Sequence, residues 1–172
     1  MIQAIVYTTN TGNTEKYAKM LGHQIDLPVY MLEDGKRILE KDTSIIYLGW
    51  IMASGIKGYK EAEKHFCVRM VCAVGMGKTG TQLEEIRSKN QISSSVEVFT
   101  LQGGFDMQKL RGVYKLMMIM MVKTAGKALA EKEDRTAEED DMLDLMINGG
   151  SRVSIDNLVE PIQWYQRIRE QI

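Results

Sequence analysis

The feature that most constrains the fold of this chain is the alternation of short apolar segments with helix-like ones before residue 102. Five segments have the length and β-branched content of buried strands: Ile2–Thr8, Pro28–Leu32, Ser44–Trp50, Cys67–Val74 and Val96–Leu101. Three segments between them are typical of helices: Glu15–Gln24, Lys57–Lys64 and Thr81–Lys89. Because strands that alternate with helices form parallel sheets covered on both faces, the sequence predicts an α/β fold with a doubly wound, five-stranded parallel sheet.

Length and charge narrow the class of protein. A chain of 172 residues fits one domain, so residues 1–172 are expected to form a single domain. The formal net charge is -1, which gives no indication of the basic face that nucleic-acid binding requires. We therefore expect no nucleic-acid partner. The longest unbroken apolar run, Leu116–Val122, is far shorter than the ~20 residues of a membrane-spanning helix.

The amino terminus and the cysteines bear on location. Met1–Tyr7 lacks the basic segment and cleavage site of a signal peptide, and we expect it to lie in the first strand. The two cysteines, Cys67 and Cys72, fall on one predicted strand, about 16 Å apart at ~3.3 Å per residue. That separation excludes a disulfide between them. The sequence therefore favours a reducing, cytoplasmic location.

The alternating pattern stops after the fifth strand. Met107–Lys123 predicts a helix whose carboxyl-terminal half is apolar nearly all round. Thr136 stands three residues before Glu139, the spacing of a capping box, which predicts a helix over Ala137–Ile147 that ends at the following Asn-Gly-Gly.

The last stretch has the periodicity of a closing amphipathic helix, Ile155–Ile172. Residues 102–153 are therefore expected to be a helical insertion between the last strand and the last helix.

A polar loop follows the first strand and opens the first helix. Free backbone N–H groups and the helix dipole favour an anion at such a junction, and Gly12 allows a close approach or a positive φ. The side chains around it offer hydroxyl or amide donors: Thr9, Asn10, Thr11, Asn13 and Thr14. A simple helix cap would account for only one of these residues. The sequence therefore predicts a phosphate site held by neutral donors.

The run Thr9-x-Thr11-Gly12-Asn13-Thr14 resembles the phosphate loop of flavodoxins, whose pattern is Ser/Thr-x-Thr-Gly-x-Thr. The resemblance in element order covers about residues 1–101 and the last helix. It implies flavin mononucleotide (FMN) as the cofactor and a strand order of 2-1-3-4-5. The flavin would then lie at the switch point between strands one and three.

In flavodoxins the loops after strands three and four flank the isoalloxazine ring. The resemblance therefore implies that the first of these loops contacts the ring through Trp50, Ile51, Met52 and Ala53. Trp50 could stack on the ring or be a buried aromatic at a strand end. The second loop would line the other side through Gly75, Met76, Gly77 and Lys78.

The second loop also resembles two nucleotide-binding motifs. Gly75–Gly80 matches Gly-x-Gly-x-x-Gly between a strand and a helix, but it follows the fourth strand, and the acid Glu97 starts its strand instead of ending it. Gly77-Lys78-Thr79 resembles the end of a Walker loop, but Cys72 stands where that motif needs glycine. We favour a flexible loop beside the flavin over both alternatives.

The insertion bears on the kind of flavoprotein. Met117, Met118, Met120 and Met121 cluster on one predicted helix, and such surfaces make adaptable contacts. A helix that is apolar all round is expected to be buried, here between the insertion and the sheet. Contact with a second subunit or a membrane face is the alternative. A basic-flanked apolar helix in an insertion after strand five also resembles the menaquinone-dependent protoporphyrinogen dehydrogenases. Gly55 fits that family's glycine, whereas Met52-Ala53-Ser54 departs from its pattern.

The sequence thus favours a flavin redox protein, either an electron carrier or a small oxidoreductase. Its expected partner is a redox protein or a quinone-like acceptor, with a homodimer or peripheral membrane contact through the Met-rich helix. The alternative is a non-catalytic binding or regulatory module on the same fold. His23 and His65 are isolated in the sequence, so we expect no metal site, and no residue is assigned a catalytic role.

Overall fold

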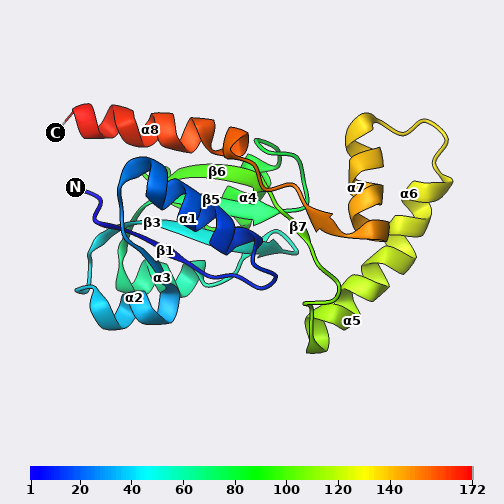
Figure 1. Cartoon of the computed structure of the whole chain (residues 1–172), viewed down its shortest axis with the longest axis horizontal. Coiled ribbons are helices and arrows are strands. Elements are labelled where there is room, and N and C mark those ends of the chain that lie inside the picture. The colour runs from blue at the N-terminus through cyan, green and yellow to red at the C-terminus, as the bar shows by residue number, and fades with distance from the viewer. Residues whose placement is uncertain (172) are drawn as a thin grey trace.

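The computed structural model describes residues 1–171 and shows an α/β fold around a parallel sheet (Figure 1). The parallel strands lie side by side in the order β2 (Val29–Met31), β1 (Ala4–Tyr7), β3 (Ser44–Met52), β5 (Cys67–Gly75) and β6 (Glu97–Gln102). A sixth strand, β4 (Gly55–Ile56), folds back antiparallel on the end of β3. The predicted α/β class and parallel sheet are confirmed, and β4 was not expected.

The central strands are mostly apolar because helices cover both of their faces. Along β3, Ile45 and Tyr47 belong to one core cluster, and Ile46 and Leu48 belong to the other. The first core includes side chains of α2 (Leu32–Ile38), α3 (Tyr59–His65) and α4 (Leu83–Asn90). The second includes side chains of α1 (Asn13–Ile25) and α8 (Val159–Glu170).

Helix α2 was not predicted. It begins directly after β2 and no side chain caps it, so the sequence shows no start signal. Gly35 interrupts its apolar pattern in the sequence. In the structure, a β-carbon at Gly35 would lie only 3.3 Å from the Val6 side chain. The glycine thus permits close packing of the helix on β1. The closing helix is preceded by a 3₁₀ turn, η2 (Ile155–Leu158), and Ile172 of the predicted range lies outside the described residues.

The predicted insertion forms an arm, residues 104–151, that projects away from the sheet (Figure 1). Its base is a two-stranded ribbon of β7 (Gly104–Phe105) and β8 (Gly150–Ser151). One side of the arm is α5 (Gly112–Met121), which continues through the π-helical turn η1 (Val122–Gly126) into α6 (Lys127–Glu131). The other side is α7 (Ala137–Asn148).

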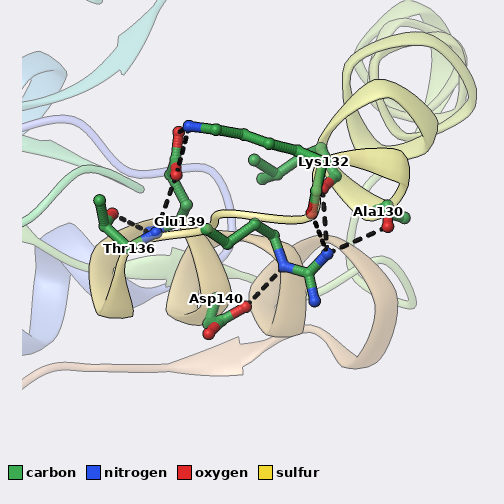
Figure 2. A network of polar contacts seen from close by, with 7 residues as sticks. Ala130, Lys132, Thr136, Glu139 and Asp140 are labelled. Atoms are coloured by element: carbon green, nitrogen blue, oxygen red, sulfur yellow. Dashed lines mark hydrogen bonds and ion pairs between the residues drawn. The ribbon is translucent and has the colours of Figure 1, made fainter.

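The predicted capping box of α7 is confirmed at the tip of the arm (Figure 2). The Thr136 hydroxyl accepts from the Glu139 N–H at 3.2 Å, and the Glu139 carboxylate accepts from the Thr136 N–H at 2.9 Å. Lys132 pairs with Glu139 at 2.6 Å, and Arg135 pairs with Asp140 at 2.7 Å. Neighbouring charges therefore neutralise one another in this run.

The expected burial of the Met-rich helix is wrong. No residue of α5 is buried. Only Tyr114 and Met118 pack partly against the small core of the arm, around Leu110 and Leu145. Because the arm is a narrow helical hairpin that stands off the sheet, one side of α5 has nothing in the described part of the chain to pack on.

Two further expectations concern cysteines and membrane spans. Cys67 and Cys72 both lie on β5, where both are free thiols, so the prediction that they form no disulfide is confirmed. Among the described residues, no helix combines the length and apolarity needed to cross a bilayer.

Candidate functional site

The loop after β1 leaves the first N–H groups of α1 without a cap. Gly12 occupies the N-cap position with φ 95° and ψ -8°, and no side chain caps the helix. The first N–H groups of a helix have no intrahelical acceptor, and here the first that bonds back into the loop is Lys16, to the Gly12 carbonyl at 3.1 Å. The N–H groups of Asn13, Thr14 and Glu15 thus have no acceptor among the described residues.

The space beside the α-carbon of Gly12 is open. A β-carbon built on Gly12 meets no atom within 4 Å, so the glycine is required by its positive φ and not by crowding. The Thr9 hydroxyl accepts from the Gly12 N–H at 3.1 Å, which closes the turn. Asn10 and Thr11 are half-buried, and Thr14 is only 1% exposed.

Asn13 has a role that the sequence did not suggest. Its side-chain amide donates to the Gly104 carbonyl at 3.0 Å, and its side-chain oxygen accepts from the Ser151 hydroxyl at 2.8 Å. The side chain therefore fastens the base of the arm to the start of α1. Only the backbone N–H of Asn13 is left for an anion.

The segment after β3 is a tight hairpin and not an open loop. Trp50, Ile51 and Met52 belong to β3 itself, and Ala53 and Ser54 form the turn into β4 with φ of 47° and 60°. The side chain of Asn90, at the end of α4, binds the backbone of this hairpin. Its side-chain oxygen accepts from the Ile56 N–H at 2.7 Å, and its amide donates to the Ser54 carbonyl at 2.8 Å. The hairpin is thus pre-formed.

Trp50 contacts an aromatic residue of the arm. Its ring meets Tyr114 edge to face, with centroids 5.2 Å apart and planes at 87°. The Lys57 ammonium lies 5.8 Å from the Trp50 centroid and 5.7 Å from that of Tyr114, within the range of cation–π attraction. Sequence reasoning missed Tyr114 and Lys57, because nothing in the linear pattern places either beside Trp50.

The backbone of Lys57 joins the first two loops. Its N–H donates to the Trp50 carbonyl at 3.0 Å. Its carbonyl accepts from the Thr8 hydroxyl at 2.8 Å and from the Tyr47 phenol at 2.7 Å. Burial raises the pKa of Tyr47 above its usual range, so the phenol remains a donor. Within residues 1–171 the Lys57 ammonium has no ion-pair partner, which leaves a cation at this edge of the sheet.

The loop after β5 is held under the arm. Met76 packs against the arm's core of Leu110 and Leu145, and the Gly75 carbonyl accepts from the Gly103 N–H at 2.7 Å. A cleft of about 630 Å³ separates this loop from α7, and Gly77 and Lys78 line it. The Lys78 ammonium bonds to Glu138 of α7 at 2.8 Å, and this carboxylate raises the pKa of Lys78.

A polar network fixes the end of β6 between this loop and the arm. The Tyr17 phenol donates to the Gln102 carbonyl at 2.5 Å. The Gln102 amide donates to Asp141 of α7 at 2.6 Å, and Arg152 pairs with Asp141 at 2.9 Å. The Thr79 hydroxyl accepts from the Gln102 N–H at 2.9 Å. The Thr79 hydroxyl is thus engaged in this network, and the Lys78 ammonium is engaged with α7 of the arm.

The structure brings all three predicted segments to one edge of the sheet. Tyr7 pairs in register with Leu48, Trp50 with Val74, and Gly75 with Gln102, so β1, β3 and β5 all end there. This arrangement defines an α/β protein with an uncapped helix N-terminus, an aromatic hairpin and a loop bonded to the arm, all at the carboxyl edge of a parallel sheet. No protein-family model matches the chain, and no curated protein has a significantly similar sequence.

Proposed function

We propose that this chain is an FMN-binding redox protein of flavodoxin-like fold. The observation that carries the proposal is the uncapped, open start of α1 beside two further loops at the same edge. The parallel strands lie in the order β2-β1-β3-β5-β6, which is compatible with the flavodoxin-like order that the resemblance implies. In open α/β sheets, ligands bind where the strand order reverses, which here is between β1 and β3.

The residues present fit the parts of the cofactor. The phosphate would bind the N–H groups that follow Gly12, with hydroxyls of Thr9–Thr14 around it. The ring would lie between the hairpin Trp50–Ala53 and the loop Gly75–Lys78. When bound, the flavin supplies the electron chemistry, and the protein supplies orientation and local charge. Lys57 adds a cation at this edge, and Tyr114 adds an aromatic side chain from the arm.

The arm favours a small oxidoreductase over a simple electron carrier. A carrier needs only an exposed ring edge, whereas ordering the arm costs about 1–2 kcal/mol of backbone entropy per residue. The arm contacts both ring-flanking segments, through Tyr114 on Trp50 and through the packing of Met76. These contacts are compatible with an enzyme that resembles the menaquinone-dependent protoporphyrinogen dehydrogenases. Its partner would be a redox protein or a quinone-like acceptor.

A titration of the apoprotein with FMN and with riboflavin tests the proposal. Two hydrogen bonds from backbone N–H groups to a charged phosphate contribute about 3 kcal/mol, so FMN should bind about a hundredfold more tightly than riboflavin, which lacks the phosphate. The purified protein should also be yellow. Equal affinity for the two flavins, or no binding of either, would refute the proposal and favour a binding module that does not use a flavin.

A further inference from the structure

One side of α5 is an exposed apolar stripe. Its members recur at the i, i+3, i+4 and i+7 spacing that places residues on one side of a helix. They are Val113 (62% exposed), Leu116 (59%), Met117 (43%) and Met120 (60%). Contiguous exposed apolar side chains mark contact sites for proteins, ligands or membranes. The stripe faces away from the arm's own core, which uses Tyr114 and Met118.

The segment that carries the stripe is basic. Residues 107–130 hold five basic and no acidic side chains: Lys109, Arg111, Lys115, Lys123 and Lys127. Two of these have long ion pairs, Lys109 with Asp106 at 3.7 Å and Lys127 with Glu131 at 3.8 Å. The other three have no ion pair within residues 1–171. The whole chain carries -1, so the positive charge is a property of this segment.

We propose that the stripe of α5 binds the surface of an anionic lipid bilayer. A helix with an apolar face and basic flanks lies in the interface plane, where the apolar side enters the acyl boundary and the cations meet lipid phosphates. Each basic residue near an anionic surface strengthens binding by roughly fivefold. Methionines suit such a surface because their side chains adapt to an irregular partner.

The same charges disfavour a second copy of the chain as the occupant. A twofold dimer places the same patch of both subunits face to face. Two α5 stripes would then bring two sets of basic side chains together, without acids in the same segments to offset them. An anionic membrane matches both the apolar and the charged part of the surface. The arm projects away from the sheet (Figure 1), and the side chains of the stripe are exposed.

Cosedimentation of the full chain with vesicles tests the proposal. We expect binding to vesicles of phosphatidylcholine mixed with phosphatidylglycerol, little binding to phosphatidylcholine alone, and weaker binding at high salt. Leu116→Glu should reduce the partition coefficient at least about tenfold, because it removes an apolar contact and adds a like charge to the anionic surface. The matched control is Ile147→Glu, since Ile147 is 65% exposed on α7 of the same arm and should have no effect.

A charge variant and two further measurements complete the test. The double change Arg111→Gln and Lys123→Gln should weaken binding while leaving thermal unfolding unchanged, since both side chains are exposed. Equal binding to both vesicle types, or wild-type binding by Leu116→Glu, would overturn the proposal. So would a wild-type dimer in light scattering that Leu116→Glu makes monomeric. Vesicle binding does not require the flavin, so this proposal and the FMN proposal fail separately.

Discussion

Gly12→Ala probes the proposed phosphate loop with little ambiguity, because the structure separates strain from crowding. A β-carbon at Gly12 meets nothing within 4 Å, but φ is 95°. Holding an alanine in the left-handed region costs about 1–2 kcal/mol. For a chain of this size we expect a fall in melting temperature of roughly 2–8 °C.

Binding should suffer more than stability. Relief of the strain turns the loop and misaligns the N–H groups that follow Gly12. Loss of one hydrogen bond to a charged phosphate costs about 1.5–3 kcal/mol, so FMN affinity should fall about 10- to 150-fold, whereas riboflavin affinity should hardly change. Isothermal titration of the apoprotein measures both.

The matched control is Gly80→Ala. Gly80 has φ 83° and an equally open β-carbon position, but its N–H bonds to Thr100 on β6, away from Thr9–Thr14. The two variants should lose similar stability in urea unfolding, and only Gly12→Ala should lose FMN affinity. If both bind FMN with the same affinity, the loop after β1 is a structural turn and the phosphate assignment is wrong.

Three further predictions concern single side chains. Lys57→Gln should weaken FMN binding and make the reduction potential more negative, because a cation beside the ring favours its anionic reduced form. The control Lys60→Gln, which removes an exposed ion pair with Glu63, should change neither the FMN affinity nor the reduction potential. An unchanged reduction potential in Lys57→Gln would exclude Lys57 from the site. Burial raises the pKa of the Cys72 thiol, so iodoacetamide at pH 8 should alkylate only the exposed Cys67 in the native protein. In urea it should alkylate both cysteines. If mass spectrometry finds Cys72 modified in the native protein, the burial of this thiol is contradicted. The chain should not hydrolyse ATP, because Lys78 and Thr79 bond to the arm and to β6, and turnover that disappears in Lys78→Ala would show a nucleotide site.

The sequence predicted the elements whose signals are local. The β-branched runs located the parallel strands to within a few residues, because burial on both faces leaves few polar positions in the central strands. The Thr136–Glu139 capping box located the start of α7, because its two hydrogen bonds join residues three apart. Residues Thr9–Thr14, Trp50–Ala53 and Gly75–Lys78 do meet at one edge of the sheet, as parallel strands require.

What the sequence did not show depends on contacts between distant segments. Ala53 and Ser54 turn with positive φ although neither is Gly or Asn, so the β4 hairpin carries no turn signature. The surroundings of α5 depend on how the arm folds upon itself, which its apolar composition alone does not determine. The position of Tyr114 on Trp50 also follows from the direction in which the arm leaves β6.

The paired base of the arm has an evolutionary consequence. Gly104 and Ser151 are cross-strand partners, and such partners have α-carbons only about 4.5–5.5 Å apart. A short turn could therefore join them, so that the whole helical hairpin can be inserted, lost or exchanged as a cassette without altering the order of the sheet. Such an exchange would release Asn13 and uncover Trp50. Relatives with different cassettes would then share the three loops of the candidate site but differ in which molecules reach it.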